Sequence, residues 1–294
     1  MEKIQQWNLV SFLSERLGAE NTVYAGLILL GGILLCMIVP YLLGSLNFGL
    51  IISKKQYNDD IRRYGSGNAG TTNMLRTYGK RAALFTLLGD MAKAAVSVAF
   101  GHFVYSTVIV DTSTGERLFI VNLSGAAIAG LFVMLGHMFP VFYKFKGGKG
   151  VATSAMVIFM LDMLNPLNGY IPIVFLICLF IFVVIVVGTR YVSLGSVMGM
   201  CLYPVIFTAF AQGQNFTACG VSVVMAVLVV FMHRENIKRL AAGKESKISF
   251  KKKKPAEGEE APAEDTAPVI TKGNIPNPPR GGDRTNTSKK KKRK

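Results

Sequence analysis

Seven long apolar stretches, separated by short polar segments, constrain the fold of this chain more than any other feature. Hydrophobic residues fill 51% of the 294 positions and charged residues only 17%, whereas a soluble domain carries charge at about a quarter of its positions. A helix of about 20 apolar residues crosses a bilayer. We therefore expect an all-α, polytopic integral membrane helix bundle rather than a soluble domain, a disulfide scaffold or a disordered chain. The expected spans lie near residues 24–52, 82–110, 118–142, 150–164, 170–189, 192–211 and 216–232.

The cysteines fit a membrane interior. They show no paired spacing of the kind that metal ligands need, and each lies in an apolar stretch. Cysteine in such surroundings behaves as a small apolar residue. We expect all of them to be buried: Cys36, Cys178, Cys201 and Cys219.

Lysine and arginine are spread unevenly over the polar segments, and this predicts the orientation. They are frequent in segments 53–81 and 143–149 and in the tail, and scarce in segments 111–117, 165–169 and 212–215. Basic loops stay on the cytoplasmic side. We therefore expect an outside N-terminus, seven transmembrane helices and a cytoplasmic C-terminus. The stretch 150–164 is short for a span, and the alternation of loops holds only if it crosses.

The same pattern divides the chain into three parts. Residues 1–23 are expected to form an external N-terminal segment and residues 24–243 the membrane domain. Residues 244–294 have a low-complexity, Lys-rich sequence that cannot build a core. We interpret them as a disordered, solvated cytoplasmic tail; contact of its basic runs with anionic lipid headgroups stays open as an alternative.

A glycine-rich motif at Gly65–Arg76 is the first of three polar insertions on the expected cytoplasmic side. It matches G-x-G-x-x-G formally, but that fingerprint needs a βαβ unit, whereas membrane helices flank this motif. Glycines let consecutive N–H groups converge on an anion, and an arginine can fork onto a phosphate. The predicted ligand contacts of this motif are Ser66, Gly67, Asn68, Thr72, Asn73 and Arg76.

The second insertion runs from Lys144 to Thr153. It is not a P-loop, because Tyr143 stands where the first glycine belongs and Gly150 replaces the metal-holding hydroxyl. Glycines and lysines at the start of a helix still make an anion site, since the backbone N–H groups and the helix dipole act in the same direction. The predicted contacts are Lys146, Gly147, Gly148 and Lys149.

The third insertion follows the last span, where His233 and Asn236 share a helical face. Its position level with two anion sites makes His233 a catalytic candidate rather than a simple interfacial residue. Two further pairs, also three residues apart, are Ser193 with Ser196 and Asp90 with Lys93. Ionisable groups inside a membrane are functional candidates, although Asp90 and Lys93 could equally serve to neutralise one another.

These features leave two functional classes, an enzyme acting at the inner leaflet and a carrier for a phosphorylated solute. A carrier usually places its site near the midplane and has internal repeats, whereas here the motifs lie at one face and no repeat relates the halves. This favours the enzyme. An H-x-x-x-x-D acyltransferase is excluded because Thr107, Phe142 and Lys238 stand where the aspartate would be.

The motifs in this order resemble the bacterial acyl-phosphate:glycerol-3-phosphate acyltransferase family (PlsY). The resemblance spans about residues 24–245 and rests on Gly44-Ser45, Asp60–Arg62, Gly65–Arg76, Lys144–Thr153, Ser193–Ser196 and His233–Leu240. It implies a seven-helix enzyme that transfers a fatty acyl group from acyl phosphate to the 1-hydroxyl of glycerol 3-phosphate, giving lysophosphatidic acid and phosphate. It implies no metal and no cofactor, and neither acyl-CoA nor acyl carrier protein as donor.

The resemblance also implies the surroundings of the enzyme and the roles of its residues. It places a multi-pass protein in the bacterial inner membrane with a cytoplasmic active site, the lipid bilayer and an acyl-phosphate-producing enzyme as partners, and no nucleic acid. The implied catalytic residues are His233, Asn236, Ser66 and Arg76, with substrate phosphate at Thr72, Lys149 and the neighbouring glycines, the serine pair at Ser193 and Ser196, and a structural acid at Glu245.

Overall fold

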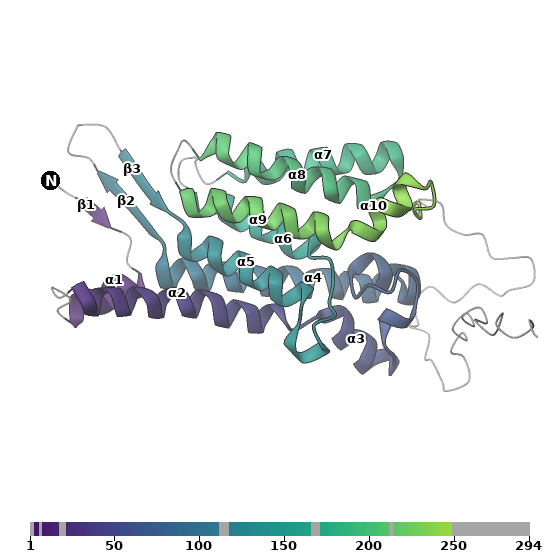
Figure 1. Cartoon of the computed structure of the whole chain (residues 1–294), viewed down its shortest axis with the longest axis horizontal. Helices are drawn as coiled ribbons and strands as arrows, with labels where there is room; N and C mark the ends of the chain where they lie inside the picture. The colour runs from purple at the N-terminus through teal and green to yellow at the C-terminus, as the bar shows by residue number, and fades with distance from the viewer. Residues whose placement is uncertain are drawn as a thin grey trace, which may run out of the picture.

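A computed structural model describes residues 3–5, 8–17, 22–111, 118–165, 171–211 and 215–248. Within them a bundle of helices carries the apolar stretches, and a small sheet lies at the end of the bundle opposite to α3 and α10 (Figure 1). The helices are α1 (Leu9–Arg16), α2 (Thr22–Gly44), α3 (Phe48–Tyr57), α4 (Thr71–Tyr105), α5 (Ser124–Met138), α6 (Val151–Met163), α7 (Ile173–Thr189), α8 (Val192–Phe210), α9 (Phe216–Met232) and α10 (Arg234–Ala241). The strands are β1 (Lys3–Gln5), β2 (Thr107–Asp111) and β3 (Leu118–Asn122), and the 3-10 turns are η1 (Ile61–Arg63) and η2 (Val141–Tyr143).

The bundle is built around α4 and α5. Helix α2 packs on both, α6 packs on α4, α9 packs on α5, and α8 lies between α7 and α9. Its interior holds large apolar side chains such as Met134, Tyr203 and Met225, all fully buried. Large apolar residues such as Phe85 and Phe180 are exposed on the outside, as expected for helices that face lipid rather than water.

The helices differ in whether their length is sufficient for a crossing. In the described residues, α4, α5 with η2, α8, and α2 together with α3 are long and apolar enough, and α9 with α10 makes a fifth if that bent pair is one span. Helices α6 and α7 are apolar but shorter than 18 residues. The chain is therefore a multi-pass helical membrane protein. The predicted seven transmembrane helices would require the shorter helices α6 and α7 to cross the membrane as well.

The prediction of an all-α fold missed the sheet. Strands β2 and β3 pair antiparallel, with Val108 opposite Val121, and β1 adds to the other side of β2. The predicted spans 82–110 and 118–142 were wrong at these ends, because their last and first residues are strands rather than helix. Both segments are rich in β-branched and aromatic residues, which fit a strand better than a helix.

Two breaks shape the end of the bundle that carries α3 and α10, and only the first falls inside a span that the sequence analysis expected to be continuous. The expected span 24–52 is interrupted after Gly44, and Asn47 begins α3 by accepting a hydrogen bond from the Leu50 N–H at 3.1 Å. In α4, Gly79 has a φ of 84°, a conformation that favours glycine. The first two turns of α4 therefore point in a different direction from the rest.

The boundary predicted at residue 243 lies too early. Beyond α10 the chain returns to the bundle, and the Ile248 N–H donates to the Arg190 carbonyl at 2.9 Å. The membrane domain therefore includes residues 244–248. The rest of the predicted tail, residues 249–294, lies outside the described residues.

Burial of the cysteines follows the prediction only in part. Cys36 and Cys178 are buried, Cys219 is half-buried, and Cys201 is exposed. The prediction for Cys201 was wrong because an apolar stretch in a membrane protein has an outward face as well as an inward one.

Candidate active site

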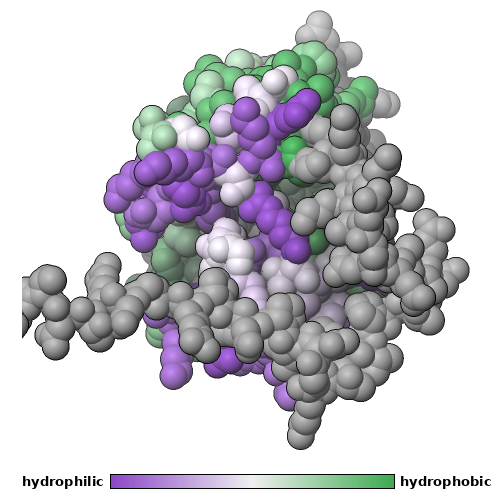
Figure 2. Space-filling model, turned by 90° about the vertical axis from the view of Figure 1, so that its right-hand side faces the viewer, coloured by the Kyte–Doolittle hydropathy of each residue, from purple (hydrophilic) through white to green (hydrophobic). Residues whose placement is uncertain are grey.

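A cavity of about 880 Å³ brings together the three polar insertions and the serine pair. It lies between α4, α6, α7 and α8, and the ends of α9 and α10 close one side. Polar residues gather on the end of the molecule shown in Figure 2, with apolar residues along its upper edge. The predicted residues that line the cavity are Ser66, Asn68, Thr72, Asn73, Arg76, Asp90, Lys149, Ser193, Ser196, His233, Asn236 and Glu245.

The first glycine loop is held in shape by Asn73. Its Oδ1 accepts from the Ser66 N–H at 3.0 Å, and its Nδ2 lies 3.2 Å from the Ile61 carbonyl and 3.0 Å from the carbonyls of Tyr64 and Asn68. We had predicted a free donor for the ligand at Asn73. The structure corrects this, because every polar atom of the side chain already bonds to the loop backbone.

Ser66 in this loop and Arg76 in the second turn of α4 are exposed polar side chains. Among the described residues, no side chain pairs with the Arg76 guanidinium. Thr72 and Asn68 line the same part of the cavity. An unpaired arginine beside hydroxyl and amide donors at a helix N-terminus is suited to an oxyanion such as phosphate.

The second glycine loop packs tightly on the end of α5. The Gly147 and Gly148 N–H groups donate to the carbonyls of Met138 and His137 at 3.1 and 3.0 Å. A Cβ on Gly147 would lie 2.0 Å from the His137 carbonyl oxygen. The expectation that these two N–H groups bind substrate phosphate was therefore wrong, since both are used within the fold; the glycines permit close approach instead.

Not every predicted residue reaches the cavity. Gly67, Lys146 and Gly147 line a separate cleft of about 670 Å³. Gly148 packs against the His137 ring. Lys93 is buried below the cavity, with its Nζ 2.8 Å from Oδ1 of Asp90.

Arg62 joins the two loops, and the sequence analysis did not single it out as a site residue. Its guanidinium pairs with Asp60 at 2.7 Å and donates to the carbonyls of Tyr143 and Lys146 at 3.3 and 2.9 Å. The hydrogen bond from Arg62 lowers the pKa of Asp60 and outweighs its partial burial. Arg62 thus fixes the position of the second loop relative to the first.

Glu245 organises the opposite wall. Its Oε1 accepts from Nδ2 of Asn236 at 2.6 Å and from the Ser193 hydroxyl at 2.8 Å, and its Oε2 accepts from Nε of Arg239 at 2.8 Å. Burial alone would raise the pKa of Glu245, but these hydrogen bonds stabilise the carboxylate and lower it. A charged Glu245 therefore orients Asn236 so that the amide oxygen faces Lys149.

Nζ of Lys149 donates a hydrogen bond to this amide oxygen, Oδ1 of Asn236, at 2.5 Å. Burial, together with the positive charges of Arg239 and Arg76, lowers the pKa of Lys149 to about 8. The bare site thus concentrates positive charge that a phosphate dianion would balance.

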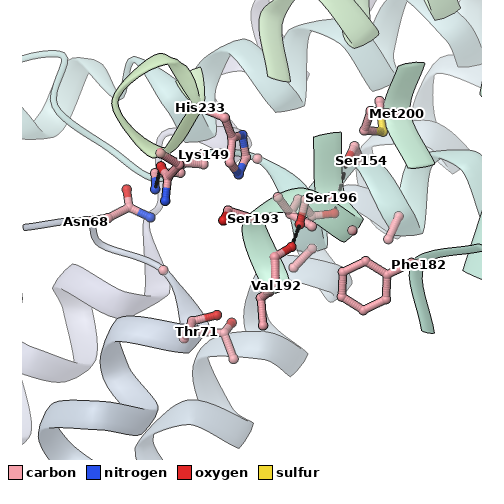
Figure 3. Close-up of a pocket in the computed structure, with 18 of the residues that line it drawn as sticks. Asn68, Thr71, Lys149, Ser154, Phe182, Val192, Ser193, Ser196, Met200 and His233 are labelled. Atoms are coloured by element: carbon pink, nitrogen blue, oxygen red, sulfur yellow. Dashed lines mark hydrogen bonds between the residues drawn. The ribbon is translucent and has the colours of Figure 1, made fainter. Parts of the chain in front are cut away.

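His233 lies at the 57° bend between α9 and α10. Its Nδ1 is 2.8 Å from the Val229 carbonyl oxygen, so Nδ1 carries the proton and Nε2 has a free lone pair. Burial and the nearby Lys149 charge lower the pKa of His233. In Figure 3 the imidazole and Lys149 lie on the same side of the cavity, so a neutral His233 is placed to take a proton from a bound group.

The other half of the cavity is apolar and runs between α6, α7 and α8. Figure 3 shows Phe182 and Met200 on the side away from Lys149. Ser196 contributes little polarity here, because its hydroxyl donates to the Val192 carbonyl at 2.9 Å. The apolar lining includes Leu87, Ile158, Phe175, Leu179, Phe182 and Met200. One cavity therefore offers an anion site at one end and an apolar groove at the other.

Comparison with known proteins identifies the family. The family model described as Glycerol-3-phosphate acyltransferase matches residues 34–243. The chain belongs to the glycerol-3-phosphate acyltransferase family. A relative from Syntrophomonas wolfei, named "Glycerol-3-phosphate acyltransferase", is 40% identical over 215 residues, which cover 73% of this chain and 96% of the relative. The protein of the same name from Clostridioides difficile is 39% identical over 215 residues, which cover 73% of this chain and 95% of that relative.

Solved structures of family members have the same fold. The glycerol 3-phosphate form of PlsY (YgiH), an integral membrane glycerol 3-phosphate acyltransferase, is similar with a TM-score of 0.59 and 32% identity, covering 74% of this chain and 96% of that one. Its lysophosphatidic acid form has a TM-score of 0.57 and 31% identity, covering 74% and 95%. The described membrane domain thus corresponds to nearly the whole length of these acyltransferases.

Proposed function

We propose that this acyltransferase transfers a fatty acyl group from acyl phosphate to the 1-hydroxyl of glycerol 3-phosphate, giving lysophosphatidic acid and phosphate. This is the first acylation step of phospholipid synthesis. The observation that carries the proposal is the single cavity in which an apolar groove continues into a cluster of cationic and hydrogen-bonding groups. Such a cavity fits a donor with an apolar chain and a phosphate, beside an acceptor that has a phosphate and no chain.

In the proposed reaction, the acyl chain lies along α6, α7 and α8, and Arg76 and Lys149 hold the two substrate phosphates. Fixing both substrates in one cavity lowers the entropic cost of their encounter. The 1-hydroxyl oxygen attacks the acyl carbonyl carbon while Nε2 of His233 takes its proton. The carbonyl oxygen becomes an oxyanion that nearby donors stabilise, and the bond to the phosphate oxygen then breaks. Because phosphate leaves readily, no covalent enzyme intermediate is needed.

The function is tested with purified protein, palmitoyl phosphate and glycerol 3-phosphate. We expect lysophosphatidic acid and phosphate in equal amounts, and no product when palmitoyl-CoA replaces palmitoyl phosphate. Product from palmitoyl-CoA alone would refute the choice of donor. Uptake of labelled glycerol 3-phosphate into protein-containing vesicles without any acyl donor would instead support the carrier alternative.

We further propose seven crossings, an outside N-terminus, a cytoplasmic C-terminus and an active site at the cytoplasmic face of the bacterial inner membrane. The support is that the basic segments 53–81 and 143–149 both border the end of the bundle that carries the site. The test introduces Glu15→Cys or Lys146→Cys, both exposed positions, after replacing the native cysteines by alanine. A membrane-impermeant maleimide applied to spheroplasts should label Glu15→Cys only; labelling of both or of Lys146→Cys alone would refute the topology.

A further inference from the structure

We propose that His137, which lies outside the three sequence motifs, binds the acyl-phosphate substrate by donating a hydrogen bond from its Nε2–H. This inference rests on the proposed function and adds a substrate-binding residue to that site. His137 is at the end of α5, is almost fully buried at 4% exposure, and lines the cavity together with Asp90.

A cluster of three ionisable groups surrounds His137. Nζ of Lys93 lies 3.0 Å from Nδ1 of His137 and 2.8 Å from Oδ1 of Asp90. The same ammonium lies 2.9 Å from each of the carbonyl oxygens of Gly44 and Leu46, at the break between α2 and α3. The cluster therefore joins three elements of the bundle at the floor of the cavity.

The contacts of Lys93 determine which nitrogen of His137 carries the proton. A lysine ammonium has three N–H donors and no acceptor. Two of these donors bond to the carbonyls at the α2–α3 break, and the third is directed at Nδ1, which then accepts. Oδ1 of Asp90 lies 2.8 Å from the ammonium but has no hydrogen-bond partner among the described residues, so it pairs with Lys93 through charge alone. The 3.4 Å distance from Nδ1 to Oδ1 of Asp90 is longer than this bond. His137 is thus a neutral imidazole with its proton on Nε2.

Nε2 lies against Gly148 of the second glycine loop, and the His137 side chain lines the cavity. A Cβ on Gly148 would lie 2.0 Å from Nε2, so any other residue at this position would cover the ring nitrogen. Within the described part of the chain, Nε2 has no hydrogen-bond partner. Asp90 and Lys93 neutralise each other's charge, so the carboxylate beneath the cavity does not repel an anionic ligand.

The position of His137 selects the acyl donor as its ligand. Asp90 lies one turn beyond Leu87 on α4, and Leu87 belongs to the apolar lining of the cavity. The cluster is therefore at the junction between the apolar groove and the anion site. Acyl phosphate has its polar head directly next to its chain, whereas glycerol 3-phosphate has no apolar part that would bring it to this junction.

Two substitutions at position 137 distinguish the Nε2–H hydrogen-bond donor from the Nδ1 acceptor that contacts Lys93. His137→Asn keeps an acceptor for Lys93 near the place of Nδ1 and removes the donor at Nε2. His137→Gln places an amide N–H near Nε2 but loses the acceptor. For His137→Asn we expect kcat/KM for palmitoyl phosphate to fall about 10- to 100-fold, as for a lost hydrogen bond to a charged group, with KM for glycerol 3-phosphate nearly unchanged.

His137→Gln should recover most of that loss, and His102→Asn is the matched control because His102 lies on α4 outside the cavity. An equal loss in folded His137→Asn and His137→Gln would overturn the donor role, and so would full activity of His137→Asn. Absence of any transfer by the unsubstituted enzyme would refute the proposed function instead, so the two failures are distinguishable.

A measurement on the unsubstituted protein does not depend on the variants folding. The chain has only 3 histidines, so ¹⁵N-histidine labelling gives a simple spectrum, which His102→Asn helps to assign. We expect His137 to be neutral and protonated at Nε2, with an Nε2 shift when the non-hydrolysable palmitoyl phosphonate is added. Protonation at Nδ1, or an unchanged Nε2 signal with the phosphonate bound, would overturn the inference.

Discussion

Replacing Asn73 by alanine should damage the first glycine loop and, through it, substrate binding. The side chain is only 2% exposed and makes the contacts to Ser66, Ile61, Tyr64 and Asn68 described above. The carbonyls of Ile61 and Tyr64 keep the N–H groups of Tyr64 and Gly67 as donors, so the substitution removes four hydrogen bonds without leaving either carbonyl unpaired. With about 0.5–1.5 kcal/mol net for each bond, the total loss is about 2–6 kcal/mol.

Most of that energy holds the loop rather than the bundle, and kinetics are therefore the sensitive assay. We expect kcat/KM for palmitoyl phosphate to fall by at least about tenfold, since one tenfold step corresponds to about 1.4 kcal/mol. The matched control is Asn47→Ala, which removes the N-cap of α3 away from the cavity and should lower the detergent melting temperature with little change in kcat/KM. Unchanged kinetics for Asn73→Ala would refute the bracing role of Asn73.

Three further perturbations test the opposite wall and the second loop. Glu245→Gln should lower kcat at least about tenfold. Both carboxylate oxygens of Glu245 accept hydrogen bonds from Asn236 or Arg239, and the glutamine amide would face one of these donors with an N–H instead of an oxygen. Near-normal kcat would show that the charge of Glu245 is dispensable. Activity should fall as pH rises through about 8, where Lys149 loses its proton. It should also fall on the acid side, and only below the ordinary histidine range, because burial lowers the pKa of His233. Lys149→Arg should move only the alkaline limb upward, and an unmoved limb would contradict the assignment. Gly148→Ala should reduce turnover because its Cβ would meet the His137 ring, whereas Gly188→Ala, with open space around it, should not; equal effects would refute the packing argument.

The sequence predicted the helices of the membrane domain and the convergence of its motifs, because both follow from strong local signals. Apolar runs of span length mark helices, and clustered glycines, lysines and hydroxyls mark anion sites. The residues Arg76, Lys149 and His233 were predicted from type and spacing, and the structure brings them to one cavity.

The remaining features depend on partners that are distant in the chain. Whether the N–H groups of Gly147 and Gly148 face a ligand or the carbonyls of α5 cannot be read from spacing, since it depends on how the loop meets another helix. His137 was missed for the same reason: its neighbours Lys93 and Asp90 are more than 40 residues away. A histidine inside an apolar stretch is itself a signal, and it could have singled out this residue.

The position of Glu245 after the last helix has a consequence for how the enzyme is made. Its carboxylate holds Asn236, Arg239 and Ser193 in place, so this wall of the cavity is incomplete until synthesis has passed residue 245. Under the proposed function, a nascent chain still emerging from the ribosome can occupy the bilayer without being able to consume acyl phosphate. Activity then begins only with the arrival of a short segment from the aqueous side.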